Sequence, residues 1–335
     1  MNKNLHVAVV GATGAVGQDM LNTLEKRDFP VGKLSLFASA KSVGKKMKFR
    51  GKEYPVQELT TTCFTGVEIA LFSAGASRSK EFASHAVKAG AVVVDNSSAF
   101  RMEADVPLVV PEINPEDIKK HKGIIANPNC STIIAIVAVN PIHRVAKVKR
   151  MITSTYQAAS GAGAKAMEEL EEQTKDVIAG REPRPASALP QRIAFNLFPQ
   201  VDVFLDNGYT KEEMKMLNET RKIMHAPDIL VSATCVRVPV LRAHSIAINL
   251  TLEKELSVAQ IRDIIAKAPG CRLVDDVANK KYPMPIDASF KDEVLVGRIR
   301  KDISQPNGIE MFVSGDQLLK GAALNAVQIA EYLLK

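Results

Sequence analysis

The chain opens with an apolar run, a glycine-rich turn and an amphipathic segment. Residues 5–10, LHVAVV, predict a buried strand, and GATGAVG predicts a tight turn that leads into a helix ending before Pro30. Further apolar runs close in small or polar residues, at VEIALFSAGAS, AVVVDNSSAFR, LVVPEIN and GIIANPNC. Such alternation of strands with helices predicts a parallel sheet whose ligand binds at the carboxyl ends of the strands.

The pattern changes from about Asn129 onward. Alternating strands there mix with helices, which predicts an α+β region with a largely antiparallel sheet. One helix carries an acidic face and ends at Gly180, and the proline-rich segment GREPRPASALPQR after it is expected to form a loop. We assign no chemistry to the glutamates of that helix. At 335 residues, the chain is long enough for two domains.

The glycines of the first turn are spaced as GxxGxxG between a strand and a helix. This placement lets the backbone turn tightly, approach a pyrophosphate and offer helix N-terminal N–H groups to its charge. A glycine pattern alone is weak evidence for a nucleotide, and its position in a strand-turn-helix unit is what strengthens it. The turn therefore predicts a dinucleotide site formed by Gly11, Thr13, Gly14, Ala15 and Val16.

The second strand, KLSLFAS, is followed by hydroxyl and ammonium groups rather than by an acid. An acid there would hold the ribose 2′-hydroxyl of NAD, whereas Ser39, Lys41 and Ser42 suit a 2′-phosphate. We therefore expect NADP as the cofactor, the alternative being a solvated basic loop. Residues that follow the later strands fall at the same sheet edge, within reach of a cofactor or a substrate phosphate: Ser73, Gly75, Ser98 and Arg101.

Charge and cysteine content narrow the class of ligand. The net charge is +7 with the basic residues scattered among acids, so small acidic or phosphorylated ligands fit better than nucleic acid. The four cysteines have neither metal-binding nor disulfide-framework spacing, and we expect no metal and a reducing cytoplasm. No apolar run approaches membrane-spanning length, and the N-terminal run is too short for a signal peptide, so we expect no membrane partner.

Cys130 is singled out by the segment NPNCST. Asn127 is a good N-cap and Pro128 suits the first helical position, so a helix is expected from about Asn127 with Cys130 in its first turn. The N–H groups and the dipole of that turn would lower the thiol pKa and make the sulfur a nucleophile at neutral pH. The alternative is a buried, inert cysteine, which is how we interpret the other three.

A thiolate beside a nicotinamide site indicates one chemistry above others. The sulfur attacks an aldehyde, the resulting hemithioacetal gives hydride to NADP, and phosphate or water takes up the thioester. In reverse, the same steps reduce an acyl phosphate.

At this point the sequence resembles the aspartate-β-semialdehyde dehydrogenase family over essentially the whole chain. The resemblance rests on the ordered segments GATGAVG, DNSSAFR, NPNCST, YQAASGAG, KEEMK, RVPVLRAHS, YPMPIDA, KDEVLVGRIR and KGAALNAVQIAEYLL. It implies NADPH-dependent reduction of β-aspartyl phosphate to aspartate β-semialdehyde, on the route to lysine, threonine, methionine, isoleucine and diaminopimelate.

The resemblance also implies an α/β fold with two domains. A discontinuous Rossmann-type NADP-binding domain would comprise residues 1–128 and 315–335. An α+β substrate and dimerisation domain with a mainly antiparallel sheet would comprise residues 129–314. We expect a homodimer built through the sheets of the second domain.

Individual roles follow from the same resemblance. Cys130 would be the nucleophile, His244 the general acid and base, and Gln157 would orient the reacting carbonyl. Arg237 would hold the substrate α-carboxylate and Glu212 its ammonium group. The remaining assignments are phosphate binding by Arg101, Asn129 and Lys215, and cofactor binding by Ser160, Gly161 and Gln317.

Some of these positions have other interpretations or depart from the family pattern. Glu212 and Lys215, three residues apart near a helix start, could simply pair at the surface. Lys41 stands where arginine is expected, and Gln317 stands where many members have asparagine. Because lysine lacks the bidentate fork of arginine, the preference for NADP over NAD would be less sharp than usual.

His244 stands an odd number of residues after Arg237 and precedes the alternating strand SIAINLTLE. On one continuous strand the two side chains would point to opposite faces and could not share a substrate. Pro239 and the polar segment LRAH indicate an interruption. We therefore predict a break in the strand between Arg237 and His244.

Two other functions stay open on the sequence alone. One is the similar acyl-phosphate reductase that acts on N-acetyl-γ-glutamyl phosphate, whose acetylated amine cannot pair with Glu212. The other is a non-catalytic NADP-binding regulator, which requires Cys130 to be unreactive.

Overall fold

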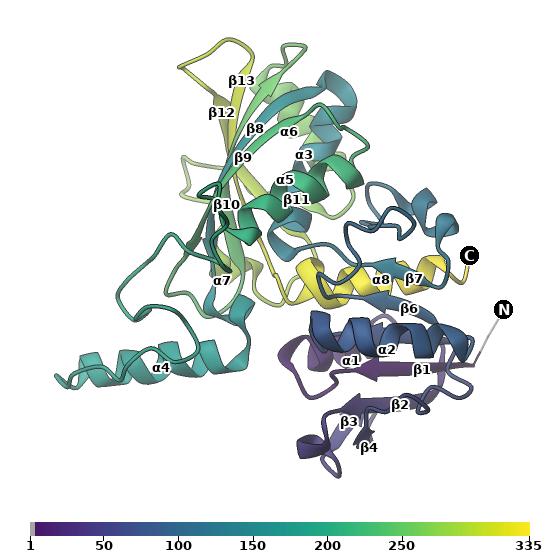
Figure 1. The fold of residues 1–335 in the computed structure, drawn as a ribbon. Coiled ribbons are helices and arrows are strands. Elements are labelled where there is room, and N and C mark those ends of the chain that lie inside the picture. The colour runs from purple at the N-terminus through teal and green to yellow at the C-terminus, as the bar shows by residue number, and fades with distance from the viewer. Residues whose placement is uncertain (1–3) are drawn as a thin grey trace. The chain divides into compact units, whose positions relative to one another are not determined.

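The computed structural model of the chain describes residues 4–335, which form two compact units (Figure 1). The first unit consists of the chain up to Asn129 together with Ala322–Lys335, and the second unit is Cys130–Gly321. The chain thus returns to the first unit at Ala322 rather than at the expected residue 315. The reason is that the residues just after the last strand bond by their side chains within the second unit.

The first unit is built on a seven-stranded sheet with the order β3-β4-β2-β1-β5-β6-β7. Neighbouring strands are parallel except for β3 and β4 at one edge. β1 is buried along its whole length, as a central parallel strand is when helices cover both faces of its sheet. The strands are β1 Leu5–Val10, β2 Val31–Ala38, β3 Lys46–Phe49, β4 Lys52–Glu58, β5 Ile69–Phe72, β6 Val92–Asp95 and β7 Ile124–Ala126.

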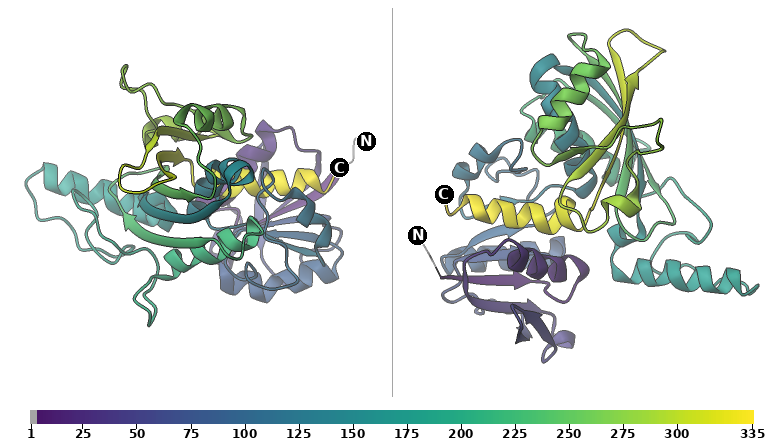
Figure 2. Two further views of the ribbon diagram at one scale, coloured as in Figure 1. Left: turned by 90° about the horizontal axis from the view of Figure 1, so that it is seen from above. Right: turned by 180° about the vertical axis from the view of Figure 1, so that it is seen from behind.

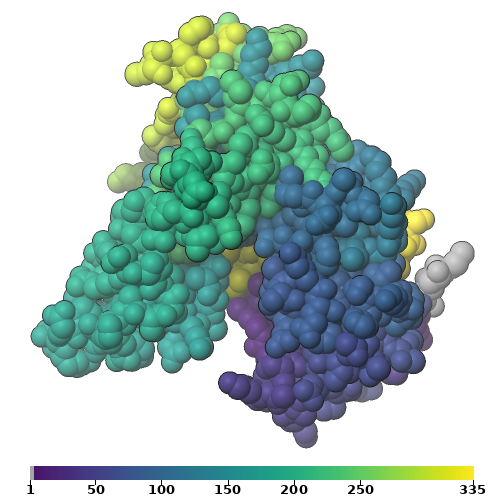
Figure 3. All heavy atoms as spheres, in the orientation of Figure 1, coloured from purple at the N-terminus to yellow at the C-terminus, as the bar shows by residue number. Residues whose placement is uncertain are grey.

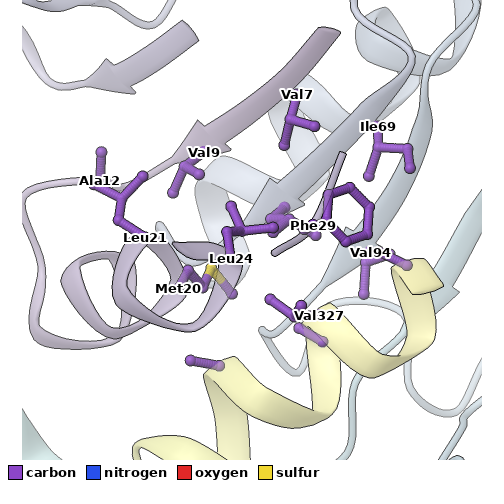
Figure 4. Close-up of a cluster of buried hydrophobic side chains, with 14 of the residues drawn as sticks. Val7, Val9, Ala12, Met20, Leu21, Leu24, Phe29, Ile69, Val94 and Val327 are labelled. Atoms are coloured by element: carbon purple, nitrogen blue, oxygen red, sulfur yellow. The ribbon is translucent and has the colours of Figure 1, made fainter. Parts of the chain in front are cut away.

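Helices from both ends of the chain complete this unit. They are α1 Ala15–Lys26, α2 Ala76–Lys88 and α8 Leu324–Tyr332, with short 3₁₀ turns at Ala40–Ser42 and Pro115–Lys120. Valines of β1, Met20 and Leu24 of α1, and Val327 of α8 meet in one buried cluster (Figure 4). Arg27 adds a two-armed ion pair to Glu331 of α8, with N–O distances of 2.6 and 2.7 Å. The last helix is therefore part of the first unit's core.

The segment LVVPEIN, which the sequence predicts to be a strand, is not one. Within the described chain, an isolated bridge between Leu108 and Ala126 joins it to β7. Pro111 has no N–H to donate. The Asn114 side chain takes up the N–H of Val110 at 3.0 Å and the carbonyl of Leu108 at 2.9 Å. Backbone groups that a longer ladder would need are thus satisfied locally.

The second unit is built on a six-stranded sheet with the order β11-β12-β13-β10-β8-β9. Its three central pairs are antiparallel and the two edge pairs parallel, so the prediction of a mainly antiparallel sheet is confirmed. The strands are β8 Val148–Gln157, β9 Leu230–Arg237, β10 His244–Leu252, β11 Cys271–Leu273, β12 Val294–Lys301 and β13 Gly308–Gly315. The helices are α3 Cys130–Ala146, α4 Ala164–Ile178, α5 Lys211–Ile223, α6 Val258–Lys267 and α7 Pro285–Ala288, with a 3₁₀ turn at Ala159–Ala162 and a π-helix at Leu319–Ala323.

Helices α3, α5 and α6 pack on one face of this sheet (Figures 1 and 2). Residues of β8 alternate between the two faces: Thr155 and Gln157 are buried beneath the helices, whereas Tyr156 is 40% exposed. Tyr156 packs beside Phe312 of β13, with ring centroids 6.0 Å apart. The face that carries these two rings is the more open one.

The acidic residues of α4 hold the proline-rich segment that follows it. Glu169 accepts hydrogen bonds from the backbone and hydroxyl of Ser187 at 2.7 and 2.9 Å. Asp176 pairs with Arg184 at 2.9 Å, and its pKa is held far below its usual range by the hydrogen bonds from Arg184 and Arg181. In the space-filling view, the teal atoms of this segment form a lobe of the second unit (Figure 3). These acids have a structural task.

The packing of the first turn yields a testable prediction. A Cβ at Gly17 would lie 2.3 Å from the carbonyl oxygen of Gly11, which a side chain cannot do without moving the backbone. At Gly14, the nearest atom would be the same oxygen at 3.4 Å. We expect Gly17→Ala to lower the free energy of unfolding by about 1–3 kcal/mol and Gly14→Ala by much less. Urea unfolding of both variants measures this, and equal losses would contradict the packing argument.

Candidate active site

The carboxyl ends of the parallel strands form a nucleotide-sized cavity in the first unit. Gly11 directly follows β1 and has φ of +82°, and a Cβ there would lie 2.4 Å from the carbonyl oxygen of Ser73. Only glycine therefore lets the two strand ends approach each other. The cavity has a volume of about 670 Å³, and six of the predicted cofactor residues line it: Gly11, Thr13, Gly14, Ser39, Lys41 and Ser73.

The other predicted cofactor residues of this unit lie around that cavity. Ser42 has its Oγ 3.5 Å from Oγ1 of Thr13. Ala15 and Val16 begin α1, so their N–H groups belong to the helix N-terminus. Gly75 precedes α2 with φ of +85°, and Ser98 is an exposed residue of the loop after β6.

Two charged residues that the sequence analysis missed also line the cavity, namely Glu58 and Arg78. Glu58 ends β4, whose parallel pairing with β2 sets it directly opposite Ala38. An acidic residue is missing after β2, and the neighbouring strand β4 thus supplies one to the same cavity. KEYPVQE alternates apolar and polar residues weakly, and identifying it as a strand would have revealed Glu58. Arg78 lies in the first turn of α2 and pairs with Glu81 at 2.9 Å.

The loop after β6 places Arg101 by its backbone contacts. Nε of Arg101 donates to the carbonyl of Asn127 at 2.9 Å, and Nη2 donates to that of Asn96 at 3.0 Å. Asp95 anchors the same loop, since it accepts from the hydroxyl of Ser97 at 2.7 Å and from that of Ser79 at 2.6 Å. Burial raises the pKa of Asp95, and these hydroxyls oppose the rise.

The helix that carries the cysteine begins at Cys130, not at the predicted Asn127. The backbone N–H of Asn127 donates to the carbonyl of Asp95, which continues the β6–β7 pairing. Its side chain accepts from Asn325 at 2.7 Å and is therefore engaged elsewhere. Pro128 also disfavours helical geometry in the residue before it, which is Asn127. Cys130 is consequently the first residue of α3, directly after the buried Asn129.

The predicted break between Arg237 and His244 is confirmed. β9 ends at Arg237 and β10 begins at His244, on either side of β8 in the sheet. Gln157, the last residue of β8, is the register partner of Arg237. The ends of three adjacent strands thus bring Gln157, Arg237 and His244 together, all of them buried.

Arg237 and His244 converge above Gly161. A Cβ at Gly161 would lie 2.9 Å from Nη1 of Arg237 and 2.9 Å from Cε1 of His244. Nη1 donates to the carbonyl of Ala158 at 2.6 Å, whereas the buried Nε has no hydrogen-bond partner among residues 4–335. Burial lowers the pKa of Arg237, and the charges of Glu212 and Cys130 oppose that shift.

The hydrogen bonds of His244 set its tautomer. The backbone N–H of Ala158 donates to Nδ1 at 3.0 Å, so the neutral ring carries its proton on Nε2. Burial lowers the pKa of His244 well below its usual value, and the charge of Arg237 lowers it further. Nε2 lies 3.4 Å from Nε2 of Gln157, too long for more than a weak contact between two N–H groups. Its proton is therefore available to a reacting group.

A chain of alternating charges continues from Gln157. Nε2 of Gln157 donates to Glu212 at 3.2 Å, and Lys215 donates to Glu212 at 3.0 Å and to Asp202 at 2.8 Å. Burial alone would lower the pKa of Lys215, but the charges of Glu212 and Asp202 outweigh it and raise the pKa. Asp202 was missed by the sequence analysis because it lies in an irregular segment, where it adopts φ of +68°.

Ser160 and Gln317 meet in the second unit. Nε2 of Gln317 donates to Oγ of Ser160, and its Oε1 accepts from the backbone N–H of Ala243 at 2.8 Å. Both side chains are buried. The carbonyl of Gln317 and one of its amide hydrogens are thus engaged by the protein.

The described residues hold no group of three or more histidine, cysteine or acidic side chains that could bind a metal ion. None of the helices in residues 4–335 has the length and apolarity to cross a membrane. The second unit instead offers a thiol at a helix start, a neutral imidazole with a free N–H edge, and a guanidinium with an open donor. This set of groups suits acyl transfer through a cysteine to or from an anionic substrate.

Comparison with known proteins agrees with this geometry. The model of the semialdehyde dehydrogenase NAD-binding domain matches residues 6–121, and that of the semialdehyde dehydrogenase dimerisation domain matches residues 139–320. The aspartate-semialdehyde dehydrogenase of Aquifex aeolicus is 57% identical over 332 residues, which cover 98% of each chain. That of Bacillus subtilis is 52% identical over 343 aligned positions, covering 100% of this chain and 99% of the relative.

Solved structures also match over nearly the whole chain. Aspartate semialdehyde dehydrogenase II of Vibrio cholerae, complexed with ASA, has a TM-score of 0.96 and 46% identity, covering 99% of this chain and 98% of that one. The Candida albicans enzyme with NADP has a TM-score of 0.77 and 25% identity, with 98% of each chain covered. With its two domain matches, its full-length relatives and its cluster around Cys130, the chain belongs to the aspartate-semialdehyde dehydrogenase family of oxidoreductases.

Proposed function

We propose that the cluster around Cys130 carries out the reaction of this family, the NADPH-dependent reductive dephosphorylation of β-aspartyl phosphate to aspartate β-semialdehyde. The observation that carries the proposal is the convergence of Arg237 and His244 over Gly161, in the same compact unit as the thiol at the start of α3. We likewise propose that the first unit is the NADP-binding domain and that the second is the catalytic and dimerisation domain.

Substrate recognition follows from the charges of the cluster. The open Nε of buried Arg237 suits the α-carboxylate, because an arginine fork binds carboxylates in two places. Glu212 suits the α-ammonium group. Lys215, Arg101 and Asn129 suit the phosphate. The Vibrio cholerae enzyme, whose crystal structure contains ASA, supports a substrate of this class.

The chemistry of the chain begins at Cys130. Its thiolate attacks the β-carbonyl carbon, a C–S bond forms, and phosphate leaves to give a thioester. His244 donates a hydrogen bond from Nε2 to the oxygen that gains negative charge, and Gln157 orients the carbonyl. NADPH, when bound, supplies the hydride. The C–S bond then breaks, the carbonyl of the aldehyde re-forms, and Cys130 leaves as the thiolate.

Residues of each unit suit one part of the cofactor. Gly11, which turns the chain with φ of +82°, and Gly14, which precedes α1 without a side chain, suit a pyrophosphate at the start of that helix. Ser39, Lys41 and Ser42 suit the 2′-phosphate of NADP, while Glu58 in the same cavity repels it. Ser160 and Gly161 suit the nicotinamide. The Candida albicans enzyme, whose crystal structure contains NADP, supports the choice.

We further propose a homodimer that forms through the open face of the second unit's sheet. The half-exposed ring of Tyr156 beside Phe312 gives this face an apolar surface, and the matched domain model is described as a dimerisation domain. None of the four cysteines forms a disulfide among residues 4–335, and we propose that the protein works in the cytoplasm.

The thioester route predicts the behaviour of one variant. The purified protein should reduce NADP with aspartate semialdehyde only when phosphate is present, and Cys130→Ala should lose at least about a thousandfold of that rate, as removal of a covalent nucleophile does. Iodoacetamide should inactivate the wild type, and substrate should protect it. Activity that survives in Cys130→Ala would refute the mechanism. Activity only with the N-acetyl-γ-glutamyl substrate would identify the rival reductase, and inert protein would support a regulator.

The cofactor assignment predicts a difference between two ligands. Lys41→Ala should weaken NADPH binding about tenfold, or ~1.4 kcal/mol, and NADH binding little, because only NADPH carries the 2′-phosphate. Glu58→Gln should strengthen NADPH binding by removing a negative charge. Fluorescence titration without substrate measures both. If Lys41→Ala weakened the two cofactors equally, Lys41 would not be the 2′-phosphate ligand.

The lowered pKa of His244 predicts how stability depends on pH. The unfolded chain protonates this histidine near pH 6.5, while the folded protein resists protonation, so stability falls as the pH drops below 6.5. Between pH 7.5 and 5.5 the wild type should lose about 1.4 kcal/mol more than His244→Gln. His6, His121 and His143 are present in both proteins, so their contributions to the pH dependence of unfolding cancel in this comparison. Urea unfolding at both pH values measures the free energy of unfolding of the two proteins. An equal loss of that free energy in both would contradict a lowered pKa of His244.

A further inference from the structure

The turn that leads into His244 is under local strain. Ala243 has φ of +71°, a region that residues with a Cβ rarely occupy, and it is fully buried. Such a conformation persists only where surrounding contacts impose it. Because Ala243 immediately precedes His244, these contacts also set the direction in which the imidazole enters the cluster.

The contacts come from two residues that follow β13. Antiparallel pairing of β10 with β13 sets His244 opposite Gly315, so the next residues lie beside the turn. Asp316 pairs with Nε of Arg242 at 2.6 Å, and Oε1 of Gln317 accepts from the N–H of Ala243 at 2.8 Å. We call these four residues, Arg242, Ala243, Asp316 and Gln317, the clasp.

Asp316 is anchored on several sides. It is fully buried, and its Oδ1 accepts from the N–H groups of Leu318 and Leu319 at 2.9 and 3.1 Å. Its Oδ2 accepts from the N–H of Phe290 at 2.7 Å, and the guanidinium of Arg242 lies 4.1 Å from the centre of the Phe290 ring. A buried ion pair adds little net stability compared with apolar packing. What this pair provides is a fixed position for the turn.

Gln317 connects the clasp to the segment that binds His244. Its Nε2 donates to Ser160, whose backbone N–H in turn donates to the carbonyl of Leu241 at 3.2 Å. Ala158, two residues earlier, gives its N–H to Nδ1 of His244 and its carbonyl to Arg237. The clasp therefore holds both the ring and the amide that sets its tautomer.

We propose that Asp316, Arg242 and Gln317 are positioning residues, which hold His244 with Nδ1 on the Ala158 amide and Nε2–H toward the reacting oxygen. This rests on the proton-donor role proposed for His244. It also assigns Gln317 a task other than the cofactor contact that the family resemblance implies, since its amide bridges two segments of the protein.

The main test uses Asp316→Asn, which keeps the shape of the side chain and removes its charge. We expect kcat to fall roughly 10- to 100-fold, because a small displacement of a catalytic group has effects of that size. The affinity for NADPH and the alkylation rate of Cys130 should stay within about twofold, because neither depends on His244.

A matched control is available in the same unit. The side chain of Asp275 is also almost fully buried. It pairs with Nε of Arg262 at 2.8 Å and accepts from the backbone N–H of Arg298 at 2.7 Å. Asp275→Asn should reduce stability in the same way and leave kcat unchanged. If both variants lowered kcat alike, the clasp would be no more than a structural pair.

The tautomer gives a readout that does not depend on turnover. In protein labelled with ¹⁵N-histidine, the wild type should show the proton of His244 on Nε2, and Asp316→Asn or Gln317→Leu should give a mixture of tautomers or a charged ring. An unchanged tautomer would overturn the proposal. If the tautomer changes as expected but His244→Gln retains full activity, the positioning holds and the proposed proton-donor role of His244 fails instead.

Three further variants keep the proposal testable if one of the single variants does not fold. Arg242→Lys keeps the charge and should retain more activity than Arg242→Gln. The double variant Arg242→Gln with Asp316→Asn should be no slower than the slower single variant, because both act through one contact. Additive losses would show that the two residues act separately and would refute the clasp.

Discussion

The hydrogen bond from the Ala158 amide to Nδ1 of His244 is the constraint on which the candidate active site depends. A fully buried imidazole cannot be hydrated, so its neutral form is favoured and its one proton must sit on the other nitrogen. Arg237 bonds to the carbonyl of that same Ala158. One short stretch of backbone after β8 thus orients both His244 and Arg237.

Burial of so many charges is tolerated because they alternate. Gln157, Glu212, Lys215 and Asp202 form a continuous series of donors and acceptors. Each ion therefore has an opposite partner or a dipole, which offsets the cost of its desolvation. Four buried side-chain atoms among the described residues lack a hydrogen-bond partner, and the Nε of Arg237 is the one donor among them that carries a positive charge. An open buried donor of this kind is suited to an anionic ligand.

The acidic side chains of the protein differ in the hydrogen-bond donors that surround them. Glu169 and Asp176 take backbone N–H groups and arginines of the loop after α4, so they stabilise that segment. Glu212 accepts from the side chains of Gln157 and Lys215, a set of donors that a substrate ammonium could join. Glu58 belongs to neither group. It lines the cavity of the first unit together with Lys41, which carries the opposite charge.

Much of the architecture could be predicted from local pattern. The apolar run of β1, the glycine turn and the cysteine at the start of α3 are short-range signals. The break before His244 follows from its odd spacing after Arg237, because side chains alternate between the two faces of a strand. Two local predictions were wrong for different reasons. Asn114, the last residue of LVVPEIN, bonds to the backbone of its own segment in place of a strand partner, whereas Asn325 of the last helix engages the Asn127 side chain that was expected to cap α3.

By itself, then, the sequence determined the family and the two kinds of sheet, and it supplied the candidates for the reactive side chains, because periodicity and motif spacing are encoded residue by residue. Only the tertiary structure decided which ring nitrogen of His244 carries the proton, and that Glu58 lines the cavity of the first unit. It also decided that Asp316 and Gln317 hold the turn before His244. These depend on strand order and register, which bring together residues far apart in the chain, and no local pattern records such pairings.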